Sequence, residues 1–262
     1  MNSNMQVNHQ MARRFEAIYF TQDAARRRQA VLAAAKLLHG ERVLDIGTGP
    51  GFLAYEAADR IGPSGEIVGL DINESMLELA GKRCADLSNV RFERADATAL
   101  PMADATVDAV LCVQVYEFVP DTTKAISEIR RVLRPGGRAV IVTADWDSIA
   151  WHATDAALME TVLAAFKRRL AHTRLARTLA SKLKQSGFEL AHSEVIPQFN
   201  LTYGHDYYSF HFLRTIEGSV TGHEGLTEQD VLKWVRDQEM LGERGQFFFC
   251  FNQILFLAMK AA

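Results

Sequence analysis

Short apolar segments alternate with amphipathic ones along most of this chain. Apolar runs of strand length, each bounded by polar or glycine-rich turns, lie at 42–46, 66–70, 90–94, 107–113 and 138–143. Between them, apolar residues recur every three or four positions, which predicts helices at 51–61, 75–85 and 121–133. Strands that alternate with helices form a parallel sheet with helices on both faces. We therefore expect an α/β fold with a doubly wound sheet.

The same alternation extends to both ends of the chain. Asp23 is a candidate N-cap for a helix that runs to Leu38 and is terminated by Gly40. Leucines spaced by four predict another helix that ends at Gly187, followed by a strand at 188–196. The run 247–259 is almost continuously apolar, as expected of a strand that is buried on both faces.

Three long segments do not belong to this pattern. They are 1–30, 146–173 and 199–245, and the last contains the helix-capping pattern Thr227-x-x-Asp230. Ligands of open α/β sheets bind at the carboxyl ends of the strands, where these segments would lie. We expect one domain over 1–262, with a core at about 40–145, 174–198 and 246–262 and a helical lid that encloses a small-molecule acceptor.

Composition and charge exclude several classes of function. The chain has 262 residues, 48% of them hydrophobic, and a net charge of −3. No basic run resembles a nucleic-acid stripe, so no nucleic-acid partner is expected. Arg26–Arg28 form the densest cationic cluster; a solvated helix face is the preferred interpretation, and contact of one arginine with a cofactor carboxylate or the acceptor is the alternative.

The cysteines and the apolar segments indicate the compartment. Three widely spaced cysteines, Cys84, Cys112 and Cys250, fit reduced thiols, and without a C-x-x-C pair no metal site is expected. The first ten residues lack the apolar core of a signal peptide, and the run 247–259 is too short to span a bilayer. We expect a cytoplasmic protein with no membrane partner.

The most informative motif is the segment 43–51, in which an apolar strand ends at an acid and three glycines follow at alternate positions. Glycines let the backbone approach a ligand closely, and the next helix start offers free N–H groups. The spacing departs from the dinucleotide pattern G-x-G-x-x-G because Phe52 stands at the position of a required small residue. The carboxylate of Asp45 favours a cationic group, the α-ammonium of S-adenosylmethionine. The loop ligands expected are Asp45, Gly47, Thr48, Gly49 and Gly51.

Two further acids follow the next two strands. Asp71 stands at the end of the second strand, where an open α/β sheet places an acid on the ribose hydroxyls of a nucleoside cofactor. Asp96 follows the third strand and is expected to accept a hydrogen bond from the adenine amino group, between the apolar faces of Ile72 and Ala97.

The ordered motifs VLDIGTGPG, GLDIN, ADATALP, VDAVLCVQVYEFVPD and LRPGGRAVIVTAD resemble those of class I S-adenosylmethionine-dependent methyltransferases, in particular the ubiquinone/menaquinone type, over residues 40–145. The resemblance implies a Rossmann-like seven-stranded sheet whose last strand is antiparallel and inserted between its neighbours. It also implies S-adenosylmethionine as cofactor and S-adenosylhomocysteine as product. Further cofactor contacts are implied for Tyr19, Met76, Cys112 and Gln114.

In the resembled family the transferred methyl points at the residues after strand four. Gln114 would direct a polar acceptor and Tyr116 would line its site, while Glu117 would orient the acceptor or act as a base. The alternatives are that Tyr116 packs under the lid and that Glu117 caps a neighbouring backbone group.

Two clusters in the lid are candidates for the acceptor site. Asp145, Trp146, Trp151 and His152 leave strand five at the cofactor edge, and His152 is the side chain best suited to act as a base near neutral pH. A second cluster, which contains Tyr203, Tyr207, Tyr208 and His211, offers rings to a planar acceptor. A partly exposed histidine and ordinary lid packing are the respective alternatives.

These observations predict in-line methyl transfer to oxygen, nitrogen or carbon of a small acceptor. One alternative is a protein that binds the cofactor without turnover and has a regulatory or scaffolding role. A less favoured one is arsenite methylation, since it needs several convergent thiols and only Cys112 is expected near the site. A homodimer is a possible assembly.

Overall fold

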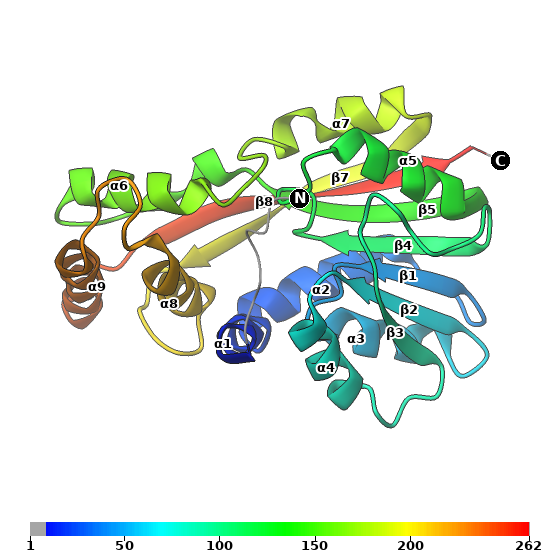
Figure 1. Ribbon diagram of the computed structural model, residues 1–262, viewed down its shortest axis with the longest axis horizontal. Coiled ribbons are helices and arrows are strands. Elements are labelled where there is room, and N and C mark those ends of the chain that lie inside the picture. The colour runs from blue at the N-terminus through cyan, green and yellow to red at the C-terminus, as the bar shows by residue number, and fades with distance from the viewer. Residues whose placement is uncertain (1–8, 262) are drawn as a thin grey trace.

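The computed structural model describes residues 9–261, which form one eight-stranded sheet with helices on both faces (Figure 1). The strand order is β3-β2-β1-β4-β5-β8-β6, and β7 pairs with the other edge of β8. The strands are β1 (Arg42–Ile46), β2 (Glu66–Asp71), β3 (Val90–Arg94), β4 (Val107–Val113), β5 (Leu133–Ala144), β6 (Ala150–Trp151), β7 (Phe188–Asn200) and β8 (Phe249–Lys260). This confirms the predicted α/β fold.

The first five strands are parallel, and β8 is antiparallel to its neighbours. Ala144 of β5 pairs with Gln253 of β8, and Ile196 of β7 pairs with the same residue from the other side. The predicted insertion of the last strand between two others is therefore confirmed. The sheet has eight strands and not seven because the two residues of β6 add a short pairing with the start of β8.

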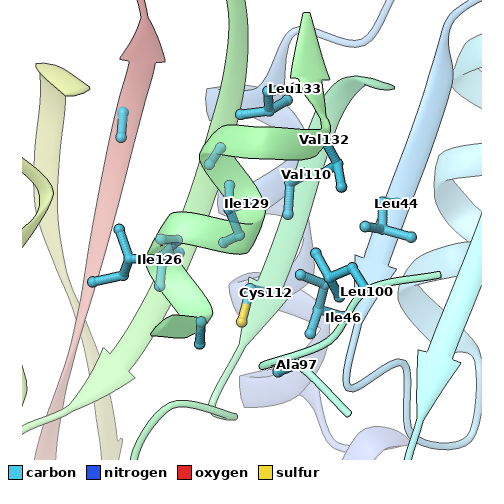
Figure 2. Close-up of a cluster of buried hydrophobic side chains, with 14 of the residues drawn as sticks. Leu44, Ile46, Ala97, Leu100, Val110, Cys112, Ile126, Ile129, Val132 and Leu133 are labelled. Atoms are coloured by element: carbon cyan, nitrogen blue, oxygen red, sulfur yellow. The ribbon is translucent and has the colours of Figure 1, made fainter. Parts of the chain in front are cut away.

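Helices cover the sheet in two layers. The helices are α1 (His9–Tyr19), α2 (Gln22–Ala35), α3 (Phe52–Ile61), α4 (Glu74–Arg83), α5 (Thr122–Val132), α6 (Ala156–Lys167), α7 (Ala176–Gln185), α8 (Tyr208–Val220) and α9 (Glu228–Glu243). Apolar side chains of α2 and α3 pack on one face of the sheet, and those of α5 and α7 pack on the other. Figure 2 shows the second layer, in which Ile126 and Ile129 of α5 lie over Val110 and Cys112 of β4.

The start of α2 differs from the prediction. Its N-cap is Thr21, whose side chain accepts a hydrogen bond from the Ala24 amide, and the helix ends at Ala35 instead of Leu38. Asp23 lies inside the first turn, buried, and accepts from the Asn200 side chain and the Tyr208 amide, both at 3.0 Å. Thr and Asp are both favourable caps, and the distant partners of Asp23 decide between them.

The strands β7 and β8 extend beyond the parallel part of the sheet, and α8, α9 and α6 lie around this extension (Figure 1). Aromatic side chains of the extension, among them Trp146, Trp151, Phe212 and Trp234, form a second hydrophobic core. The capping pattern of the sequence is confirmed, because Thr227 and Asp230 form a reciprocal capping box at the start of α9. The extension is thus a packed helical unit built onto two long strands.

No helix in the described part of the chain is long and apolar enough to cross a membrane.

Candidate active site

The three glycines of the loop after β1 have different roles. All have positive φ, 66° at Gly47, 53° at Gly49 and 80° at Gly51, which favours residues without a Cβ. A Cβ on Gly47 would lie 2.2 Å from a methyl carbon of Val115, and one on Gly49 would lie 3.0 Å from the Tyr19 hydroxyl. Gly51 packs instead on α4, where a Cβ would lie 2.9 Å from the Cα of Ala80. The first two glycines therefore shape the ligand loop, and the third allows close helix packing.

Asp45 is a buried carboxylate with no cationic partner among the described residues. Only 2% of its surface is exposed, and the Thr48 hydroxyl donates to it at 2.7 Å. Burial raises the pKa of Asp45 to about 7, the Thr48 hydrogen bond lowers it and the charge of Asp71 raises it. Asp45, Gly47 and Thr48 line a small cavity, and Tyr19, Arg27 and Arg28 complete its wall. A cation bound in this cavity would stabilise the carboxylate, so the site fits the ammonium group that the sequence predicts.

Asp71 is held rigidly beside the loop. The Gly49 amide donates to one carboxylate oxygen at 3.0 Å, and the Asn73 amide donates to the other at 2.9 Å. Burial raises the pKa of Asp71, and these backbone hydrogen bonds lower it. Ile72 next to it is 53% exposed, and Asp96 is exposed at the end of β3, with Ala97 buried behind it. The arrangement offers an acid and an open apolar surface to a nucleoside.

The carboxyl terminus of α1 covers the loop. Tyr19 stacks on Phe52 with the ring centres 5.7 Å apart, and its hydroxyl points at Gly49. Arg83 of α4 lies 3.4 Å over the Phe52 ring, donates to the Pro50 carbonyl at 2.8 Å and pairs with Glu16 of α1 at 2.6 Å. These contacts hold α1 against the glycine loop.

A buried polar cluster lies at the carboxyl end of β4, next to the loop. Its centre is Arg27 of α2, which is 2% exposed and donates to the side-chain oxygens of Gln114 at 2.5 Å and Gln253 at 3.4 Å. Gln198 of β7 donates to the same oxygen of Gln253 at 3.3 Å, and the Tyr208 hydroxyl interacts with Gln114. Gln114 has a φ of 55°, a strained conformation for a residue with a side chain. Sequence positions from both halves of the chain meet here.

Glu117 follows the cluster and is fully buried. One carboxylate oxygen accepts from the Ala144 amide at the end of β5, at 3.0 Å. Burial raises the pKa of Glu117 to about 7, while the hydrogen bonds it accepts and the Arg27 charge lower it. Glu117 thus caps a backbone group, as one alternative predicted, and its pKa is also in the range of a general base.

Comparison with known proteins decides the family. A model of the methyltransferase domain matches residues 37–210. The chain belongs to this methyltransferase family. It is 43% identical over 116 residues to a demethylmenaquinone methyltransferase of Deinococcus radiodurans, a match covering 44% of this chain and 48% of that protein. An arsenite methyltransferase of Halobacterium salinarum is 38% identical over 111 residues, 42% of this chain and 28% of that one. The chain therefore matches less than half the length of these relatives.

Solved structures share the fold over most of the chain. A phosphoethanolamine N-methyltransferase of Haemonchus contortus, in complex with S-adenosylhomocysteine, superposes with a TM-score of 0.64 and 20% identity over 98% of this chain and 58% of that one. The [4+2]-cyclase SpnF superposes with a TM-score of 0.60 and 22% identity over 91% of this chain and 81% of that one. The predicted class I family is confirmed, and with it S-adenosylmethionine as the cofactor.

Other residues predicted near the methyltransferase cofactor lie deeper in the structure. Cys112 is fully buried under α5, where burial raises the pKa of its thiol (Figure 2). Tyr116 is also buried, and its hydroxyl donates to the Ala125 carbonyl of α5 at 3.2 Å. Met76 lies buried in the first turn of α4 and packs with Ala12 of α1. The environment of Tyr116 favours packing, the alternative that the sequence left open.

The cluster predicted after strand five is not gathered at one point. Asp145 pairs with Arg177 at 3.0 Å, and Trp146 packs in the aromatic core of the extension. Trp151 pairs with Phe249, four residues along β8 from Gln253, which is about 13 Å for an extended strand. His152 follows it with an exposed side chain. Glu117 bonds to Ala144, which pairs with Gln253, so Glu117 lies at the far end of this separation. His152 and Glu117 therefore do not belong to one catalytic group.

The residues predicted around α8 surround its first turn. Tyr203 packs on Phe210 and Phe247, and His211 shares a 2.7 Å hydrogen bond with the His205 carbonyl. Tyr207 precedes the helix as its N-cap residue. Their roles toward an acceptor stay predictions.

Three members of the buried polar cluster, Arg27, Gln198 and Gln253, were absent from the preferred prediction of the site. The preferred solvated face was wrong for Arg27 and Arg28, which are buried; only Arg26 has an exposed side chain. Gln198 and Gln253 received no role, whereas Tyr208 was grouped with the rings expected to line a planar acceptor. A signal was present for Gln253, because it falls in phase with Phe249, Phe251 and Leu255 on the buried face of its strand. A polar residue at such a position needs a polar partner.

Proposed function

We propose that this protein transfers a methyl group from S-adenosylmethionine to a small-molecule acceptor. The observation that carries the proposal is the pairing of a buried, unneutralised Asp45 with the glycine loop and the fixed carboxylate of Asp71. These carboxylates are hydrogen-bond acceptors, complementary to an ammonium group at one end of a ligand and to ribose hydroxyls at the other. Family membership and the cofactor support the same reaction class.

Different residues would bind different parts of the cofactor. Asp45 and the amides of the glycine loop would hold the amino-acid end, Asp71 the ribose, and Asp96 with Ile72 the adenine. Tyr19 closes over the loop, and Arg28 beside it is already paired with Glu56 at 2.7 Å. When bound, the cofactor supplies an electrophilic methyl group on its sulfonium. The remaining work of the chain is to orient the acceptor and exclude water.

The covered position of the residues after β4 supports a small-molecule acceptor. The loop is covered by α1, and the extension with α6, α8 and α9 stands beside the ends of β4 and β5. Gln114 and Glu117 lie at that point, one as a polar guide and the other as a candidate proton acceptor for a nucleophile that carries a proton. The methylated atom, oxygen, nitrogen or carbon, depends on the acceptor.

Two alternatives are weighed against specific observations. The [4+2]-cyclase with the same fold shows that this architecture also serves other chemistry, which keeps a cofactor-binding protein without methyl transfer as the second candidate. Arsenite methylation is disfavoured. Cys84 and Cys112 are buried, and no three His, Cys, Asp or Glu side chains of the described residues are grouped to hold a metal ion.

Titration calorimetry with S-adenosylhomocysteine tests the proposal. The wild type should bind it more tightly than NADH, and Asp71→Ala should weaken binding by about 10- to 100-fold, the loss of one or two charge-assisted hydrogen bonds. The matched control is Asp86→Ala, which removes an exposed carboxylate after α4. A screen of phenols, amines and heterocycles with labelled S-adenosylmethionine then tests turnover. Unchanged affinity of Asp71→Ala contradicts the ribose assignment, tighter NADH binding contradicts the whole proposal, and binding without any turnover favours the second candidate.

A further inference from the structure

The guanidinium of Arg27 is a buried cation that lacks a carboxylate partner. It forms no ion pair with any described residue, and its hydrogen bonds go to the neutral amides of Gln114 and Gln253. Its Nε atom is buried without a hydrogen-bond partner. Burial lowers the pKa of Arg27, and the charge of Glu117 raises it. A buried cation is costly unless an anion or a full set of acceptors compensates it.

The neighbours of Arg27 show the same incomplete bonding. Gln198 and Gln253 bond to each other, and each has one side-chain amide atom left without a partner. These atoms, the Gln253 nitrogen and the Gln198 oxygen, are buried and have no partner in the described chain. Native proteins leave few such groups unsatisfied, and a cluster of them marks a place where a ligand completes the bonding. The unused Arg27 Nε and Gln253 Nε2 are both donors, on two side chains that contact each other, and such donors suit an oxyanion.

The cluster lies between the cofactor loop and the extension, because Arg27 lines the same small cavity as Asp45 and Thr48 and also contacts Gln253 of β8. Gln114 follows β4, while Gln198 and Gln253 belong to the strands that continue into the lid extension. Tyr208, which interacts with Gln114, stacks on Phe251 at 6.1 Å and so joins the polar cluster to the aromatic core. Arg28 lines this cavity as well, and it donates to the Tyr19 carbonyl at 2.7 Å.

We propose that Arg27, together with the side-chain amide of Gln253, binds an anionic oxygen of the acceptor, so that the substrate is a planar molecule carrying a carboxylate or an acidic enolate or phenolate. This inference rests on the proposed function, because it names the substrate class of the same site. The charge of the bound oxyanion would be balanced by the guanidinium, and the ring would lie toward Tyr208 and Phe251.

The test compares benzoate with benzamide, two planar probes of equal shape that differ in charge. Each is titrated into the protein saturated with S-adenosylhomocysteine and followed by calorimetry. Benzoate should bind at least 10-fold more tightly than benzamide, and Arg27→Gln should weaken benzoate binding by about 10- to 100-fold. Arg27→Lys, which keeps the charge, should retain part of the affinity. Arg60→Gln, on the exposed side of α3, is the matched control and should leave benzoate binding unchanged.

The affinity of the same variants for S-adenosylhomocysteine distinguishes a failure of this inference from a failure of the proposed function. If Arg27 serves the acceptor, Arg27→Gln binds S-adenosylhomocysteine within about 3-fold of the wild type. Equal binding of the two probes, no binding of benzoate to the loaded protein, or a cofactor affinity that falls 10-fold or more in Arg27→Gln overturns the inference and leaves the methyltransferase proposal standing. Failure of the wild type to bind S-adenosylhomocysteine overturns the proposed function itself.

Discussion

Replacing Glu117 with glutamine should make the stability of this protein less sensitive to pH. The raised pKa of Glu117, about 7 in the fold against 4.5 for an unperturbed glutamic acid, means that the folded state binds a proton more tightly than the unfolded state. Between these values stability falls as pH rises, because ionisation is penalised only in the fold. The penalty is about 0.8 kcal/mol at pH 5 and about 3.3 kcal/mol at pH 8. Glutamine keeps an oxygen for the Ala144 amide but does not titrate.

Urea unfolding of wild type and Glu117→Gln at pH 5 and pH 8 measures the effect. The difference in unfolding free energy between the two proteins should shift by about 2.5 kcal/mol in favour of the variant at pH 8. Titration of Asp45, whose pKa is also raised to about 7, is common to both proteins and cancels. Glu194→Gln, an exposed carboxylate on β7, should show no such shift. The reasoning would be refuted if the difference in unfolding free energy between wild type and Glu117→Gln changed by less than about 0.5 kcal/mol from pH 5 to pH 8. That result would show that Glu117 is ionised throughout this range.

Two further predictions concern the cofactor loop. Gly49→Ala places a methyl 3.0 Å from the Tyr19 hydroxyl at a φ of 53°, so affinity for S-adenosylhomocysteine should fall by about 10-fold or more in calorimetry, whereas Gly81→Ala, in open space on α4, should leave it unchanged; equal effects of the two substitutions would contradict the role of the loop. Arg83→Ala removes the contacts of α4 with Glu16 and Pro50, so stopped-flow dissociation of S-adenosylhomocysteine should accelerate several-fold as α1 loosens, and an unchanged rate would show that α1 is held by other contacts.

The cofactor half of the site could be predicted from sequence because its determinants are local. Asp45, Gly47 and Gly49 lie within five residues at one strand end, and Asp71 lies at the end of the strand that pairs with it. The sheet order of a doubly wound fold then brings these ends together without further information. The family resemblance added the inserted antiparallel strand, which periodicity alone could not orient.

The buried polar cluster, which we propose as part of the acceptor site, could not be predicted in this way because its residues are distant in sequence. Arg27 contacts Gln114 and Gln253, which are 87 and 226 positions away. Three consecutive arginines give no indication of which one faces the sheet, since that depends on the rotation of α2 on β8. The position of the α2 cap depended on Asn200, 177 positions from Asp23, for the same reason.

The long strands β7 and β8 explain how one sheet can serve both halves. Their inner residues, such as Leu255 and Ile196, pack under α2 as part of the core below the cofactor loop, and their outer residues, such as Phe249, pack in the aromatic core of the extension. Gln198 and Gln253 lie between these two regions, and each has a buried polar atom without a partner among the described residues, which costs free energy. Substitutions there would alter what the acceptor must offer while leaving Asp45, Asp71 and the glycines untouched.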